Sequence, residues 1–151
     1  MVELNSLTIG GYKLNILIAP DSFKGSLSAE QVANTIREAL LEDWQHLSIT
    51  TKPMADGGEG TIDAILAATK GKRIHLTTTG PLGEPISTSY ALLHSDTAIV
   101  ETAMHAGLDQ VPNHLRNPYH TTSYGVGEAI LDAINKGCKK VIVALGGSAT
   151  N

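Results

Sequence analysis

The chain has 151 residues, of which 42% are hydrophobic, 17% charged and 4% aromatic, and its formal net charge is -4. This composition is typical of a globular domain and excludes a disordered chain, and the weak negative charge argues against nucleic acid as a partner. The apolar run 141–145 is far shorter than the roughly 20 residues that span a bilayer, so we expect no membrane association. The single cysteine cannot form an internal disulfide, which indicates a reducing compartment, most simply the cytoplasm.

The first regular elements are predicted by local patterns. Residues 1–12 match no regular element and are expected to be a leader or extension. The β-rich run 16–19 is followed by a proline and predicts a buried strand. Ser28 followed by Gln31 is the pattern of a capping box, and apolar residues recur at helical spacing behind it. We therefore predict an amphipathic helix over 29–43.

The order of strand, loop and helix then repeats. Residues 49–52 predict a second strand. Apolar residues from Ile62 onward predict a second helix, which is expected to close at Gly71. This βαβ order is typical of a parallel sheet, so the sequence predicts an α/β fold class.

The pattern changes in the middle of the chain. Residues 74–78 and 86–92 alternate between apolar and polar side chains on either side of a turn at 80–83. Alternation around a glycine-containing turn predicts an antiparallel hairpin. Residues 97–101 could add a third strand to it.

The last part of the chain predicts a loop, a helix and a strand. Residues 105–120 are rich in glycine, proline and asparagine and predict a loop with little regular structure. Thr121 or Thr122 is expected to cap a helix that ends at Gly137. Residues 141–145 are apolar and mostly β-branched, which predicts a strand buried on both faces.

The last strand runs directly into a glycine-rich loop, where the chain stops. A buried strand before such a loop normally needs a following helix to cover the sheet. We therefore expect the chain to be truncated, as the N-terminal piece of a longer protein, because an uncovered strand edge is a liability. The alternative is a small domain with a frayed C-terminus.

Three loops that follow predicted strands could carry chemistry, because ligands bind at the carboxyl ends of strands in open α/β sheets. In the first loop, residues 20–26, Lys24 supplies a cation beside a helix N-terminus, and the two together suit a phosphate oxygen. Asp21 could hold a metal or accept a hydroxyl proton. The alternative is that Asp21 and Ser22 only satisfy backbone donors at the helix start.

The second loop, residues 56–61, combines three glycines with two acids. Gly57 and Gly58 would let backbone N–H groups approach a ligand closely. Asp56 and Glu59 offer the carboxylate oxygens that Mg²⁺ favours. The alternative is that both acids only complement the helix dipole.

The third loop, residues 146–151, follows the last predicted strand and resembles an anion-binding nest. Its candidate phosphate- or substrate-binding residues are Gly146, Gly147, Ser148, Thr150 and Asn151. The alternative is simple fraying at the chain terminus. The sequence lacks the Gly-x-x-x-x-Gly-Lys-Ser/Thr pattern, which excludes a Walker-type phosphate loop.

These loops resemble one known family, the bacterial glycerate kinases that phosphorylate D-glycerate with ATP. The resemblance covers residues 13–151, and six motifs occur in the family's order. They are residues 18–29, 54–61, 79–83, 101–103 with 107–108, 121–128 and 146–151.

The resemblance implies a fold of two α/β domains, one of them Rossmann-like, with the active site between them. Residues 13–79 would then be the first part of the Rossmann-like domain. Residues 80–151 would be the start of a second, incomplete α/β domain that the antiparallel hairpin introduces. Family members are longer than this chain, which agrees with an N-terminal portion.

The resemblance also implies the reaction: transfer of the ATP γ-phosphoryl group to D-glycerate, which gives 2-phosphoglycerate, or alternatively 3-phosphoglycerate, and ADP. In this reaction Lys24 would neutralise phosphate or the glycerate carboxylate, as expected for phosphoryl transfer. Asp21 and Asp56 would orient the hydroxyl or hold Mg²⁺, and Glu59 would lie on the metal side. The glycines of the second and third loops, with Ser22, Ser148, Thr150 and Asn151, would bind anionic oxygens.

Two other functions remain compatible with the sequence. One is a non-catalytic α/β module that binds phosphate or a carboxylic acid, and the other is a structural fragment of a truncated reading frame. The oligomeric state is left open by the sequence.

Overall fold

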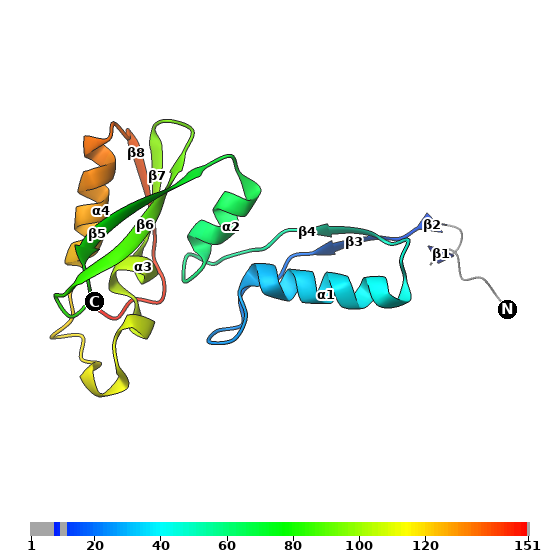
Figure 1. The fold of residues 1–151 in the computed structure, drawn as a ribbon, viewed down its shortest axis with the longest axis horizontal. Coiled ribbons are helices and arrows are strands. Elements are labelled where there is room, and N and C mark those ends of the chain that lie inside the picture. The colour runs from blue at the N-terminus through cyan, green and yellow to red at the C-terminus, as the bar shows by residue number, and fades with distance from the viewer. Residues whose placement is uncertain (1–7, 10–11, 151) are drawn as a thin grey trace. The chain divides into compact units, whose positions relative to one another are not determined.

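The computed structural model describes residues 8–9 and 12–150, and Figure 1 traces them. They form two compact units, Met1–Ala55 and Asp56–Asn151, each of which is described by itself below. The predicted leader lies mostly outside the described residues. The assignment of residues 13–79 and 80–151 to two domains of a longer protein stays a prediction.

The first unit pairs two parallel strands with one helix (Figure 1). Its elements are β1 (Thr8–Ile9), β2 (Tyr12–Lys13), β3 (Asn15–Ile18), α1 (Ala29–Asp43) and β4 (Ser48–Thr51). β1 pairs with β2 antiparallel, and β3 pairs with β4 in parallel with Ile16 opposite Ile49. The predicted βαβ order is therefore confirmed for this part of the chain.

Helix α1 begins where the capping box predicts. The Gln31 N–H donates to Ser28 Oγ at 3.2 Å, and the Ser28 N–H donates to Gln31 Oε1 at 2.8 Å. These bonds satisfy two of the backbone donors that the first helical turn leaves without an intrahelical partner. Val32 and Ala33 lie behind the box and are buried, so the cap fixes which face of α1 packs on the sheet.

The second unit is a four-stranded mixed sheet with helices on both faces. Its elements are α2 (Thr61–Ala68), β5 (Lys72–Thr79), β6 (Pro85–Leu93), β7 (Thr97–Glu101), α3 (Thr102–Ala106), the short 3₁₀ turns η1 (Leu108–Gln110) and η2 (Asn113–Leu115), α4 (Tyr124–Asn135) and β8 (Lys140–Ala144). The strand order is β5-β6-β7-β8. β5, β6 and β7 are antiparallel neighbours, and β8 is parallel to β7. The predicted α/β class and the antiparallel hairpin are both confirmed.

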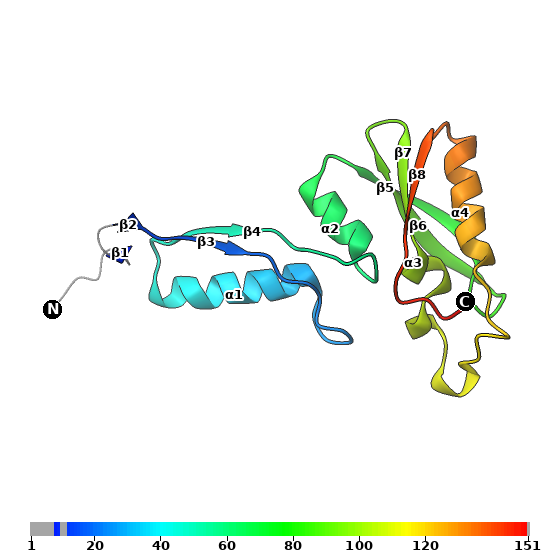
Figure 2. The same ribbon diagram turned by 180° about the vertical axis from the view of Figure 1, so that it is seen from behind.

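The core of the second unit lies under α4 on one face of the sheet and under α2 on the other (Figure 2). Tyr90 is fully buried on the α4 side, and its hydroxyl donates to Asp132 Oδ2 at 3.0 Å. His105 is also fully buried, and burial lowers its pKa to about 4. The imidazole is therefore neutral at pH 7, and its Nδ1 lies 3.3 Å from Thr78 Oγ1.

Helix α4 ends at Asn135, and Gly137, the residue predicted to close it, follows two residues later. Gly137 has a φ of 93°, and its N–H donates to Ile134 O at 2.9 Å. The Cys138 N–H donates to Ala133 O at 3.0 Å. This pair of bonds is the Schellman motif, which requires a left-handed residue at the position that glycine fills.

Two details of the sequence prediction are wrong. Helix α2 ends at Ala68 rather than at Gly71, and Gly71 lacks the positive φ of a helix-closing glycine. Position 71 instead favours glycine for lack of space, because a Cβ there would lie 2.5 Å from Leu93 Cδ2. The segment 105–120, expected to be a loop with little regular structure, contains only the last two residues of α3 and the short turns η1 and η2 as regular elements, so this prediction is confirmed.

The second wrong detail concerns β8, which was expected to be buried on both faces. It is an edge strand of the described sheet, and the side chain of Ile142 is 47% exposed. The reason is that α2 packs on β6 and β7 rather than on β8.

In the part of the chain that the structure describes, no helix is both long and apolar enough to cross a bilayer.

The two glycines near the start of α4 make the packing testable. A Cβ at position 125 would lie 2.1 Å from the backbone oxygen of Thr79, whereas a Cβ at 127 would meet nothing within 4 Å. We expect Gly125→Ala to lower the free energy of unfolding by at least about 2 kcal/mol, because β5 and α4 must separate. Gly127→Ala should leave it unchanged or raise it by up to about 1 kcal/mol. Denaturant titration measures both, and equal effects would contradict this packing.

Candidate functional site

The glycine loop, residues 56–61, is closed by its own side chains. Asp56 Oδ1 accepts a hydrogen bond from the Gly58 N–H at 2.9 Å, and Thr61 Oγ1 donates to Gly58 O at 2.7 Å. Gly57 and Gly60 have φ values of 98° and 86°, which favour glycine at both positions. One of the two Asp56 oxygens therefore serves the backbone of this loop, and the expected alternative, that Asp56 and Glu59 only complement the helix dipole, stays a prediction.

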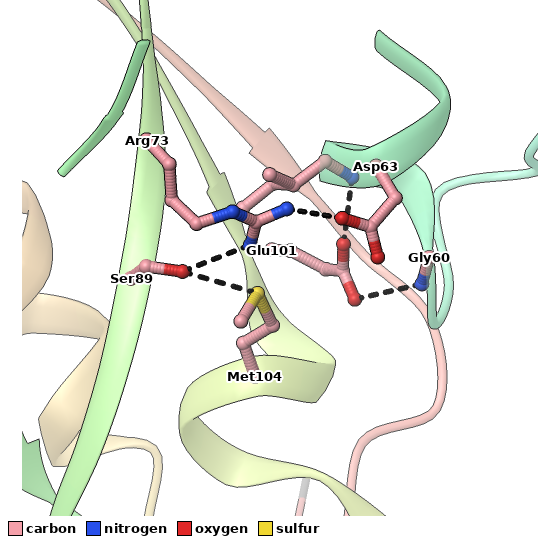
Figure 3. Close-up of polar contacts among 7 residues, drawn as sticks. Gly60, Asp63, Arg73, Ser89, Glu101 and Met104 are labelled. Carbon is pink, nitrogen blue, oxygen red and sulfur yellow. Dashed lines mark hydrogen bonds and ion pairs between the residues drawn. The ribbon is translucent and has the colours of Figure 1, made fainter. Parts of the chain in front are cut away.

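A carboxylate that the sequence analysis did not select holds the C-terminal end of this loop. Glu101 lies at the end of β7 and is 1% exposed. Its Oε1 accepts from the Gly60 N–H at 3.1 Å, and its Oε2 accepts from the Ile62 N–H at 2.8 Å (Figure 3). Glu101 thus takes donors at the N-terminus of α2 that an anionic ligand could otherwise use.

The surroundings of Glu101 raise the pKa of its carboxyl overall. Burial raises the pKa of its carboxyl above the ordinary value, and the two backbone hydrogen bonds oppose that rise. The nearby charges of Asp63 and Glu59 raise this pKa further. The only sequence signal for Glu101 was its place in a family motif at the end of an apolar strand, which says nothing about its contact with α2.

The third loop packs directly against the glycine loop. A Cβ at position 146 would lie 2.6 Å from Gly58 Cα and 2.8 Å from Gly58 N. A Cβ at position 57 would lie 3.4 Å from Leu145 O. Two of the three loops selected from the sequence are therefore in backbone contact, and the absence of a side chain at Gly146 permits that contact.

The third loop is also tied to the end of α3. The Leu108 N–H donates to Gly147 O at 2.7 Å, and the Ala149 N–H donates to Ala106 O at 2.8 Å. These bonds form a short antiparallel bridge between Gly107 and Ser148. The loop is held on both sides through residue 150, so the frayed terminus that was the alternative is wrong for residues 146–150.

The hydroxyls of the third loop make local bonds. Ser148 Oγ accepts from the Thr150 N–H at 3.2 Å, and Thr150 Oγ1 donates to Thr121 O at 3.2 Å. Thr121 Oγ1 in turn donates to Ala149 O at 2.8 Å. Asn151, the last predicted ligand, lies outside the described residues. The binding roles of Ser148, Thr150 and Asn151 stay predictions.

In the first unit, residues 23–27 form a tight turn. The Phe23 N–H donates to Leu27 O at 2.9 Å, and the Leu27 N–H donates to Phe23 O at 3.1 Å. Lys24 and Gly25 lie at the tip of this turn, where Gly25 has a φ of 70°. The turn therefore holds the Lys24 backbone while its side chain remains exposed.

The other predicted residues of the first loop lie beside the segment that follows β4. The Met54 N–H donates to Pro20 O at 2.9 Å, so both strand ends of the first unit continue side by side. Asp21 Oδ1 accepts from the Ser22 N–H at 2.7 Å. The catalytic roles of Lys24 and Asp21, and the binding role of Ser22, stay predictions.

The donor chemistry for a metal is present in part. Asp56 and Glu59 supply hard carboxylate oxygens on one short loop, which suits Mg²⁺. One Asp56 oxygen already accepts the Gly58 N–H. Among the described residues, no group of three or more His, Cys, Asp or Glu side chains could hold a metal ion. Mg²⁺ binding by Asp56 and Glu59 therefore stays a prediction.

One open cavity, of about 540 Å³, lies on the sheet of the second unit and includes none of the predicted site residues. It is lined by Arg73, His75, Leu76, Thr77, Ser87, Thr88, Ser89 and Met104. Arg73 pairs with Asp63 on α2 and donates to Ser89 Oγ at 3.0 Å (Figure 3). The guanidinium of Arg73 in this cavity is thus already bound by Asp63 and Ser89.

Known proteins share these loops and the strands that carry them. Residues 16–151 match the model of the glycerate kinase family. The chain belongs to the glycerate kinase family. The family resemblance read from the six motifs is therefore confirmed.

Bacterial proteins are among the relatives of this glycerate kinase family chain. It is 45% identical to glycerate 2-kinase of Escherichia coli (strain K12) and 42% identical to glycerate kinase of Bacillus subtilis (strain 168), each over 139 residues. Each alignment covers 91% of this chain and 36% of the relative, so the chain spans about a third of the length of these curated relatives. A solved structure from Salmonella typhimurium LT2, assigned as glycerate kinase 2, aligns with a TM-score of 0.73 and 45% identity over 91% of this chain and 37% of that chain.

The contact between the two loops can be tested in this family member by Gly146→Ala. The new Cβ would overlap the Gly58 backbone, so we expect a lower melting temperature and faster hydrogen exchange at the amides of residues 57–61. Gly127→Ala is the matched control, because that position is open. Exchange at 57–61 as slow as in the parent protein would contradict the packing of the two loops.

Proposed function

We propose that the complete protein carrying this chain transfers the γ-phosphoryl group of ATP to a hydroxyl of D-glycerate, and that it does so in the cytoplasm. The observation that carries this proposal is the family match over residues 16–151. The name of the E. coli relative, glycerate 2-kinase, favours 2-phosphoglycerate as the product, with 3-phosphoglycerate as the alternative. The free, buried Cys138 is compatible with a reducing compartment.

The loops would contribute mainly positioning and charge stabilisation, which dominate catalysis of phosphoryl transfer. In this proposal Lys24 neutralises a phosphate or the glycerate carboxylate from the tip of its rigid turn. Asp21 orients the reacting hydroxyl. Asp56 and Glu59 would hold Mg²⁺, which supplies charge neutralisation at the phosphates when it is bound.

The backbone of the second and third loops would bind anionic oxygens. Gly57 and Gly146 lie where the backbones of the two loops pack directly against each other, which would bring backbone N–H groups of both loops near one ligand. The Gly60 and Ile62 N–H groups are excluded from this role because Glu101 already accepts from them. Gly147, Ser148, Thr150 and Asn151 complete the proposed set, together with Gly58, whose N–H would have to leave Asp56 Oδ1 to bind a ligand.

A coupled assay of ADP release with D-glycerate tests the function. It should be run on this 151-residue chain and on the full-length protein, with ³¹P NMR to identify which hydroxyl is phosphorylated. ADP release that depends on D-glycerate in the full-length protein is expected. Thermal stabilisation by ATP–Mg²⁺ or D-glycerate without any turnover would instead identify a non-catalytic binding module.

Lys24 provides the first mutational test. We expect Lys24→Ala to lower kcat of the full-length protein by at least roughly 100-fold, the size typical of losing a charged contact in the transition state. Lys139→Ala, which removes an exposed lysine outside the motifs, is the control and should leave kcat unchanged. Near-normal turnover of Lys24→Ala would remove Lys24 from the site.

Asp56 provides the second test. In Asp56→Asn the amide oxygen can still accept the Gly58 N–H, so only the negative charge is lost. We expect the Mg²⁺ concentration for half-maximal activity to rise by roughly 10-fold or more. Asp63→Asn removes the same charge from the first turn of α2 and serves as the control. An unchanged Mg²⁺ titration would assign Asp56 to the loop backbone alone.

A further inference from the structure

Helix α2 starts without a cap of its own. Its N-cap residue is Gly60, which is left-handed and has no side chain to accept the N–H groups of the first turn. A serine, threonine, aspartate or asparagine usually fills this role locally. Here the acceptor is Glu101, which is 41 residues away in the chain from Gly60 and 39 from Ile62.

This arrangement is costly for the fold. A carboxylate removed from water loses hydration, and only good hydrogen bonds or a counter-ion offset that loss. Arg73 pairs with Asp63, and no ion pair to Glu101 occurs among the described residues. Backbone N–H groups and the helix dipole are what hold the charge of Glu101. A costly acceptor of this kind suggests a role beyond capping.

Glu101 also links the two loops of the candidate site. Its side chain holds the end of the glycine loop, 56–61 (Figure 3). Its own backbone continues directly into α3, and the third loop is bonded by Ala106 at the end of α3 and by Leu108 just after it. In the parallel pairing of β7 with β8, Glu101 lies opposite Ala144, two residues before the third loop begins. One residue therefore fixes the glycine loop to the same strand ends that carry the third loop.

We propose that Glu101 is a positioning residue for phosphoryl transfer: its buried carboxylate sets the conformation of the glycine loop 56–61 against the loop 146–150. This inference rests on the proposed glycerate kinase function. Glu101 does not touch the reacting groups in this proposal. It acts through Gly60 and Ile62, and the residues it aligns are Asp56 and Glu59.

The test uses Glu101→Gln and Glu101→Asp in the full-length protein. Glutamine keeps the size of the side chain but presents an NH₂ group to one of the two N–H donors, so one hydrogen bond is lost. Aspartate keeps the charge but is one methylene shorter. Asp132→Asn is the matched control, because Asp132 is a carboxylate of the same unit that accepts from Tyr90 on the α4 side of the sheet.

Two readouts separate positioning from mere stability. The first is hydrogen exchange at the amides of 57–62, which we expect to be at least roughly 10-fold faster in Glu101→Gln and unchanged in Asp132→Asn. The second is kcat with D-glycerate and ATP, which should fall roughly 10- to 100-fold in Glu101→Gln, less in Glu101→Asp and not at all in Asp132→Asn. Any variant that does not fold is replaced in the comparison by the other Glu101 variant.

The outcomes are distinguishable. Faster exchange in 57–62 together with lower kcat supports the inference. Unchanged exchange, or faster exchange with parental kcat, overturns it. Equal losses of kcat in the Glu101 variants and Asp132→Asn also overturn it, because they indicate a general loss of stability. A full-length parent protein with no D-glycerate-dependent ADP release contradicts the proposed function and with it the catalytic part of the inference, whereas the exchange data still decide whether Glu101 orders the loop.

Discussion

The second unit depends on one buried carboxylate that accepts two backbone N–H groups. Helix α2 leaves its first-turn donors open because it starts at a left-handed glycine, and Glu101 supplies both acceptors from the end of β7. Leaving such donors unsatisfied in a buried position would cost roughly 1–3 kcal/mol each. The loop, the helix and the strand are therefore joined at a single side chain, and the acidic loop residues take their places from it.

Close backbone contact is the second constraint on the site. Gly146 lies against Gly58 so tightly that any Cβ would overlap the neighbouring backbone. The same reason explains Gly125, which allows α4 to approach the end of β5. These glycines are selected by space rather than by φ, in contrast to Gly57 and Gly60, which adopt left-handed conformations. A glycine-rich sequence thus combines two separate physical requirements.

Membership of the glycerate kinase family gives these contacts a chemical context. The loops of the candidate site all follow strand ends, where α/β folds present their ligand-binding residues. Because the chain spans about 36% of the length of its curated relatives, the reaction is proposed for the complete protein. Within the second unit, the contact of two glycine-rich loops and the burial of Glu101 are properties of the chain itself.

The sequence alone determined where several helices and strands begin and end. The capping box of Ser28 and Gln31 set the start of α1, alternation predicted the hairpin, and Gly137 marked the end of α4, because each signal acts over a few residues. The motifs also sufficed to identify the family.

Only the tertiary structure decided which residues far apart in the sequence contact one another. It selected Glu101 as the partner of Gly60 and Ile62, and it left Ile142 half exposed in a strand whose composition predicts burial. Both outcomes depend on the path of the chain. Periodic patterns in the sequence do not show which residues some 40 positions apart form a hydrogen bond, or which strands a helix covers. The energy of a buried charge is likewise set by its surroundings, which no local pattern contains.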